Sequence, residues 1–194
     1  MKNKINSLPE NNPNERFLLG RKGKNNLMVI GLNSSTADKD KHDKTSANIE
    51  AIAEANGYDG WVIFNLTPER QTHPGDLSMS ENITLLSENT NFIDGFLVAN
   101  KLNVKDVLVA WGNLDHYYNQ DYLKKYAYII LDRLQKHDLS YWCIKKTKNG
   151  HPFHPSTQSL NCHVGPVKDI VLKPFEVKPY MKMIRPFNLR DTIS

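Results

Sequence analysis

Cysteine is scarce in this sequence of 194 residues, which contains only Cys143 and Cys162. Two cysteines are too few for a disulfide framework or a four-cysteine cluster, so a reducing compartment is expected. No apolar run approaches the roughly 20 residues that span a bilayer, and the polar residues 1–16 lack the apolar core of an export signal. These absences predict a cytoplasmic protein without a membrane-embedded part.

The sequence also lacks several motifs that identify common enzyme classes. It contains no Gly-x-x-x-x-Gly-Lys loop and no Gly-x-Gly-x-x-Gly fingerprint, which argues against nucleotide hydrolysis and dinucleotide redox chemistry. A Ser-His-Asp hydrolase is weakly supported, because no Gly-x-Ser-x-Gly elbow is present. The formal net charge is only +4, which permits contact with a polyanion without requiring it.

The apolar residues fall into two alternating patterns. Short continuous runs, at residues 27–32, 60–64, 107–111 and 140–145, have the length of buried strands. Segments with helical spacing follow the first three runs, at residues 45–56, 83–99 and 122–137. Strands that alternate with helices predict parallel βαβ units. We therefore expect an α/β protein with a three-layer α/β/α architecture, in which a central, mainly parallel sheet lies between two layers of helices.

The two ends of the chain differ from this central pattern. Residues 1–16 are rich in Asn, Pro, Lys and Glu and are expected to form a flexible leader before a single α/β domain at residues 17–167. Residues 168–194 form a basic C-terminal extension in which lysines alternate with aromatic residues. That alternation suits contact with a nucleic-acid backbone and its bases. Packing on the domain itself, or on a second copy, is an equally good interpretation.

Polar clusters follow each of the four long predicted strands. They occupy residues 33–38, 65–70, 112–113 and 151–156. In an open parallel sheet, ligands bind outside the carboxyl ends of the strands. We therefore expect these clusters to converge on one active site assembled from four loops.

The first cluster begins with Asn33, followed by Ser34, Ser35 and Thr36. The Asn33 carboxamide can hold a water molecule or read a substrate edge, and the residues behind it can donate to an anion. The alternative is a turn whose side chains cap their own backbone.

The second and third clusters offer groups suited to a flat ligand. Asn65 has an acceptor and two donors, the complement of an imide or amide edge on a base, and Arg70 can bind phosphate. Trp111, Gly112 and Asn113 can place an aromatic ring against the ligand. Asn65 can equally be a turn residue that satisfies its own backbone, and Trp111 can simply belong to the core.

The fourth cluster lies in a loop at residues 148–156 that is stiffened by two prolines. Its two histidines, His151 and His154, suit proton handling, stabilisation of an anion or metal binding. With Cys162 and His163 nearby, a metal site is conceivable, but the spacing matches no common zinc pattern closely. The loop can also be a rigid surface loop whose histidines bond backbone groups.

Seven short motifs follow one another along the chain: Asn33-Ser34-Ser35-Thr36-Ala37-Asp38, Asp43-Lys44-Thr45, Gly57-Tyr58, Asn65-Leu66, Arg70-Gln71-Thr72-His73-Pro74, Ala110-Trp111-Gly112 and Gly150-His151-Pro152-Phe153-His154-Pro155. Their order and spacing, over about residues 27–160, resemble an uncharacterised bacterial and phage family, a domain of unknown function. That family usually opens with Asn-Pro-Ser-Thr-Ala-Asp, and this chain has Ser34 where proline is usual.

Four motifs also resemble, in the same order, those of the uracil-DNA glycosylase superfamily: Gly31-Leu32-Asn33, Asn65 after Val62-Ile63-Phe64, Trp111-Gly112 and His154-Pro155-Ser156. The resemblance implies a glycosylase-like fold in which Asn33 positions the attacking water and Asn65 reads a flipped pyrimidine. It further implies that His154 stabilises the departing base anion, while the loop that contains Ser156 enters the minor groove.

The resulting hypothesis is a hydrolase that cleaves the N-glycosidic bond of a damaged or modified pyrimidine in DNA. DNA is then the expected partner, and no metal or cofactor is expected. His151 could perform the task of His154, and the sequence does not separate the two. Two alternatives are a non-catalytic module that binds a nucleotide or nucleic acid, and an N-glycoside hydrolase that acts on free nucleosides or nucleotides.

Overall fold

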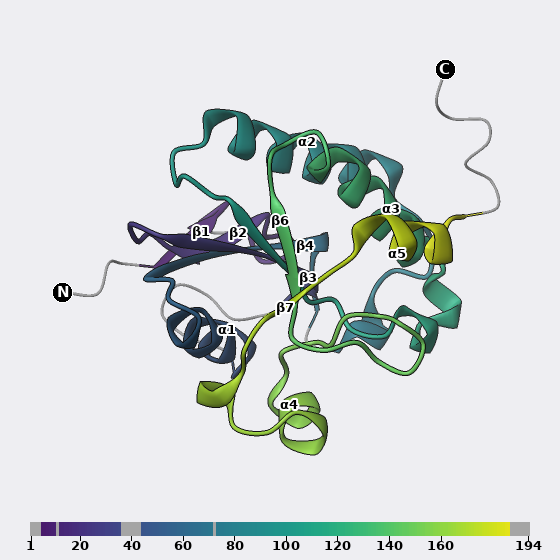
Figure 1. The fold of residues 1–194 in the computed structure, drawn as a ribbon. Coiled ribbons are helices and arrows are strands. Elements are labelled where there is room, and N and C mark those ends of the chain that lie inside the picture. The colour runs from purple at the N-terminus through teal and green to yellow at the C-terminus, as the bar shows by residue number, and fades with distance from the viewer. Residues whose placement is uncertain (1–4, 11, 36–43, 72, 187–194) are drawn as a thin grey trace.

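The computed structural model describes residues 5–10, 12–35, 44–71 and 73–186. Seven strands form one mixed sheet in the order β1-β2-β4-β3-β5-β6-β7 (Figure 1). The central strands β4, β3, β5 and β6 are parallel, and β1, β2 and β7 pair antiparallel at the edges. The strands are β1 (Ile5–Leu8), β2 (Leu18–Arg21), β3 (Asn26–Ser34), β4 (Gly60–Arg70), β5 (Asp106–Val109), β6 (Ser140–Cys143) and β7 (Lys173–Pro174).

Helices cover both faces of the sheet. In the described part of the chain, α2 (Ile83–Ala99), α3 (Tyr122–Leu134) and α5 (Val177–Ile184) lie above it in Figure 1, and α1 (Lys44–Ala55) and α4 (Thr157–His163) lie below it. Short 3₁₀ turns occur at Pro74–Asp76, Leu114–His116, Tyr118–Gln120 and Val167–Asp169. The expected α/β fold with parallel strands at its centre is confirmed. None of the described helices combines the length and apolar character needed to cross a bilayer.

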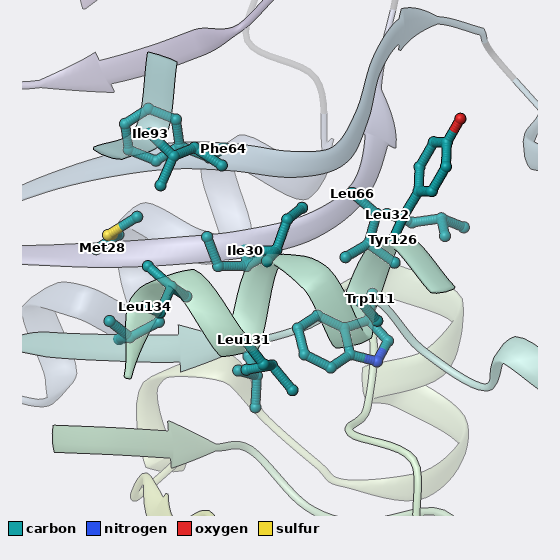
Figure 2. Close-up of a cluster of buried hydrophobic side chains, with 14 of the residues drawn as sticks. Met28, Ile30, Leu32, Phe64, Leu66, Ile93, Trp111, Tyr126, Leu131 and Leu134 are labelled. Carbon is teal, nitrogen blue, oxygen red and sulfur yellow. The ribbon is translucent and has the colours of Figure 1, made fainter. Parts of the chain in front are cut away.

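Side-chain alternation along the strands divides the core into two parts. In β3, Met28 and Ile30 pack with α2 and α3, while Leu27 and Val29 pack with α1 on the other face. Figure 2 shows the first part, in which Trp111 lies near Leu131 of α3. Burying one such side chain contributes roughly 1.5–3 kcal/mol. The two apolar faces therefore hold the sheet between its helix layers and fix the direction in which each strand side chain points.

Strand β4 is longer than the sequence indicates. Residues 60–64 were expected to form the strand and residues 65–70 a loop, but the strand continues to Arg70. Its second half pairs on one side with β3, where Asn33 lies opposite Thr67. On the other side, Arg16 N–H donates to the Pro68 carbonyl at 2.8 Å. These partners are distant in sequence, so the polar residues of this segment gave no local sign of the strand.

The described parts of both terminal segments belong to the folded domain. The segment for which a flexible leader was expected contains β1, which pairs with β2. The basic extension supplies β7, which pairs with β6, and α5, which packs against α3. In residues 173–184 five side chains are buried in the core, while the lysines and Met183 are exposed. The buried residues are Phe175, Val177, Tyr180, Met181 and Ile184. Packing on the domain therefore explains this part of the extension.

Candidate functional site: a basic cleft at the strand ends

A cleft of about 980 Å³ opens at the carboxyl ends of the central strands. This volume is suited to a ligand of nucleotide size. The ends of β3 and β4, the loop after β5, the segment after β6, and parts of α1 and α4 form its walls. The structure brings residues of all four polar clusters here. The candidate residues that line the cleft are Asn33, Ser35, Asn65, Trp111, Gly112, Asn113, His154 and Ser156.

Three other candidates among the described residues do not line the cleft. Ser34 is fully buried and bonded to Asn65. Arg70 directs its guanidinium at the N-terminal segment, where Nη1 donates to the Asn12 carbonyl at 3.1 Å. His151 is buried behind the wall. Thr36 lies outside the described residues.

Two of the lining residues act as helix caps. Asn113 Oδ1 accepts from the Asp115 N–H at 3.1 Å, and Ser156 Oγ accepts from the Ser159 N–H at 3.3 Å. Each of these side chains satisfies a backbone N–H in the first turn of its helix. Their main effect is to fix the loop ends beside the cleft.

The floor of the cleft contains two carboxamides on neighbouring strands. Alternation places Asn33 of β3 and Asn65 of β4 on the α1 face of the sheet. Asn33 Nδ2 donates to the carbonyls of Gln71, at 2.8 Å, and Ser34, at 3.1 Å. These two bonds fix the amide, and no described residue donates to its Oδ1. Asn33 therefore offers the cleft an oriented acceptor.

Gly31 makes room for Asn65. The two residues are partners in the parallel register of β3 and β4. A Cβ on Gly31 would lie 2.5 Å from Asn65 Oδ1, which is far inside van der Waals contact. The absence of a side chain at residue 31 therefore lets the Asn65 carboxamide occupy the floor.

The opposite wall depends on a second glycine. Gly112 has φ of +84°, and a Cβ there would lie 3.2 Å from the Cβ of His154. Positive φ is strained for residues with a side chain. Gly112 therefore permits both the turn after β5 and the close approach of the histidine loop.

Gly112→Ala is expected to destabilise the protein by about 1–2 kcal/mol, because it combines positive φ with crowding against His154. The matched change, Gly95→Ala in α2, has no atom within 4 Å of the new Cβ and should stabilise by about 0.5–1 kcal/mol. Urea denaturation of both variants measures the difference. Equal stabilities of the two variants would contradict this account of Gly112.

His151 belongs to a buried hydrogen-bond chain. Trp111 Nε1–H donates to the Tyr180 hydroxyl at 2.8 Å, and that hydroxyl lies 2.8 Å from His151 Nδ1. Since Tyr180 accepts from the indole, its own proton goes to Nδ1. The His151 Nε2–H then faces Asp115 Oδ1 at 3.4 Å. His151 thus helps to hold Trp111 in the wall of the cleft through Tyr180, whereas His154 lines the cleft directly.

Burial lowers the pKa of His151, and the carboxylate of Asp115 partly opposes this shift. The charges of Lys124 and His116 act in the same direction as burial. The Asp115 carboxyl itself has a pKa lowered to about 2, chiefly because it accepts a hydrogen bond from Lys124. His151 is therefore neutral in the folded protein near neutral pH, as the hydrogen-bond chain requires.

The lowered pKa of His151 predicts a loss of stability in weak acid. Below about pH 6.5 the unfolded chain binds a proton at this residue while the folded chain does not. The free energy of unfolding should therefore fall by up to about 1.4 kcal/mol per pH unit from this group as the pH decreases. His151→Asn should flatten the dependence of Tm on pH between 8 and 5. An equally steep profile in this variant, with His73→Asn as the exposed control, would contradict the assignment.

The cleft also contains basic residues that were not among the candidates predicted from the sequence. Arg16, Lys145, Lys146 and Lys148 line it, and no carboxylate does so among the described residues. Lys146 Nζ lies 5.3 Å from the centre of the Phe175 ring, which positions the cation. The one sequence signal was the lysine cluster directly after β6. A basic cleft of this kind suits an anionic ligand such as a phosphate ester.

A metal site is not assembled in the described residues. They contain no group of three or more His, Cys, Asp or Glu side chains able to hold an ion. His151 faces Tyr180 and Asp115, while Cys162 and His163 line the cleft. The set considered from the sequence is therefore divided between two environments.

Comparison with known proteins identifies the family of the chain. It belongs to the family described as "Protein of unknown function (DUF1643)", whose model matches residues 16–156. The expected membership of a family of unknown function is therefore confirmed. No curated protein and no solved structure gives a significant match. The match ends at Ser156, before α5 and its Tyr180.

Proposed function

We propose that this member of the DUF1643 family is an N-glycosylase that hydrolyses the bond between a modified pyrimidine and its deoxyribose in DNA. The observation that carries the proposal is the convergence of Asn33, Asn65 and His154 on one basic cleft. The resemblance to the uracil-DNA glycosylase superfamily assigns each of these three residues a step in the same reaction.

The proposed reaction needs three things from the protein. The base must leave the helix and be read on its edge, a task we give to Asn65. A water must be held for attack on C1′ of the sugar, and the fixed Oδ1 of Asn33 can accept its hydrogen bond. The glycosidic electron pair departs with the base, and His154 stabilises the resulting negative charge until the base takes up the proton that the water releases.

The charges of the cleft support a nucleic-acid ligand. Arg16, Lys145, Lys146 and Lys148 attract phosphate groups, and the described lining presents no carboxylate to repel them. The same feature favours a second candidate, a module that binds a nucleotide or nucleic acid without turnover. In the described residues, no lining carboxylate is present to activate the attacking water.

The experiment that tests the proposal is base release from DNA carrying a panel of damaged and modified pyrimidines. Single-stranded and duplex substrates are incubated with the protein, and abasic sites are detected by strand cleavage. Release of one base supports the glycosylase and names its substrate. Binding to the DNA without release of any base would overturn the glycosylase and favour the binding module.

A further inference from the structure

The floor of the cleft contains a hydrogen-bonded pair, Ser34 and Asn65, that fixes the direction of a carboxamide. The exposed fractions of the two residues are 0% and 5%. Ser34 lies at the end of β3, where the register with β4 shifts between Asn33 and Ser34. At this shift the Ser34 hydroxyl meets the side chain of Asn65. The pair is therefore held by two strands and is shielded from solvent.

The chemistry of the bonds determines which way the amide points. The Ser34 hydroxyl has one hydrogen, and it donates this to the backbone carbonyl of Arg16 at 2.7 Å. Its Oγ must then accept from Asn65, whose Nδ2 lies 3.0 Å away. A flipped Asn65 would place two acceptors against each other with no proton between them. The nitrogen is thus fixed on the Ser34 side.

The oxygen of the same amide is left for a ligand. Asn65 Oδ1 lies beside Gly31, and both residues line the cleft. No residue in the described ranges donates a hydrogen bond to this oxygen. Because this oxygen is accessible from the cleft and the bond to Ser34 fixes its direction, a ligand in the cleft can donate a hydrogen bond to it.

From this arrangement we propose that Ser34 is a specificity-determining residue, which turns Asn65 Oδ1 toward the ligand and so selects a base with a ring N–H. The proposal rests on the proposed use of the cleft for a base. Uracil and thymine carry a hydrogen on N3, which Oδ1 can accept. Cytosine carries a lone pair at N3, which Oδ1 repels. Ser34 does not contact the ligand; it acts through the orientation of Asn65.

Binding to uncleavable DNA tests the selection without requiring turnover. Three single-stranded oligonucleotides differ at one 2′-fluoroarabino nucleotide, which carries uracil, N3-methyluracil or cytosine. The fluorine makes the glycosidic bond resistant to cleavage, because it disfavours the positive charge that develops on the sugar in the transition state. By fluorescence anisotropy, the wild-type protein should bind the uracil oligonucleotide about tenfold or more tightly than either of the others.

Ser34→Ala tests the role of the hydroxyl. In this variant the amide can rotate, so the preference for uracil over cytosine should fall to within about threefold. A loss of structure alone would weaken the binding of both oligonucleotides equally and leave the ratio of their affinities unchanged. Ser87→Ala, an exposed serine on α2, is the control and should keep the wild-type ratio. The wild-type comparison with N3-methyluracil stands even where Ser34→Ala folds poorly.

The outcomes separate this proposal from the glycosylase. Equal binding of uracil and N3-methyluracil by the wild-type protein, a preference for cytosine, or an unchanged ratio in a Ser34→Ala variant that keeps the wild-type circular dichroism spectrum would each overturn the role of Ser34. Base release would remain a separate result in all three cases. Conversely, selective binding without release from any cleavable substrate would overturn the glycosylase and leave Ser34 as the selector of a binding module.

Discussion

Alanine at Asn33, Asn65 or His154 should each lower the rate of base release by about a hundredfold or more. In the proposed reaction the three residues serve different steps: Asn33 holds the water, Asn65 holds the base and His154 stabilises the leaving charge. Removing one oriented donor or one acid–base group typically costs a factor of about 10²–10³ in rate. Single-turnover release of the base identified in the substrate panel measures the effect.

Matched substitutions separate catalysis from general damage. Asn91→Ala and His73→Ala change the same residue types at exposed positions that do not line the cleft. Both should keep the wild-type rate and Tm. His151→Ala should lower stability more than His154→Ala, because His151 bonds Tyr180 inside the wall. Full activity in all three cleft variants would refute the assigned roles.

A chain that ends at Leu172 should fail to fold, which is the largest stability effect we expect. The truncation removes β7 and α5, and with them Phe175, Val177, Tyr180, Met181 and Ile184, each at most 8% exposed. At about 1.5–3 kcal/mol for each buried side chain, the loss is roughly 7–15 kcal/mol. A whole domain is commonly stable by only about 5–15 kcal/mol. Circular dichroism and urea denaturation of the truncated chain test this.

The control for the truncation keeps the helix and removes its charge. Lys178 and Lys182 are exposed on α5, so the double change to alanine should leave the urea midpoint within experimental error. A salt-dependent loss of DNA affinity in this variant would add a nucleic-acid contact to the packing role. A truncated chain that unfolds cooperatively at the wild-type midpoint would show that α5 is dispensable for the core.

Local sequence patterns predicted most of the fold. The apolar spacing indicated a helix at residues 83–99, and α2 spans Ile83–Ala99. The continuous apolar runs indicated the four central strands, because a strand buried on both faces carries that pattern itself. The second half of β4 lacks it. Its order comes from pairing with β3 and the segment around Arg16, and such long-range pairs leave no periodic trace in a single segment.

For the candidate site, the sequence predicted which loops come together but not the role of every residue in them. Topology alone indicated that Asn33, Asn65 and His154 would meet, since parallel strands end at one edge of the sheet. Separating His154 from His151 required the position of Tyr180, which lies 29 residues further along the chain. Likewise, Ser34 appeared as a donor to a ligand, and only the register shift in β3 shows that its hydroxyl holds Asn65.

Strand β7 has a consequence for the solubility of the protein. It consists of two residues at the end of the sheet, a lysine and a proline. An exposed edge strand can recruit a strand of another molecule and so begin aggregation. Here the edge is short, carries a charge, and has no N–H at Pro174 to offer a neighbour. The C-terminal segment that completes the core thus also protects this edge against intermolecular β-pairing.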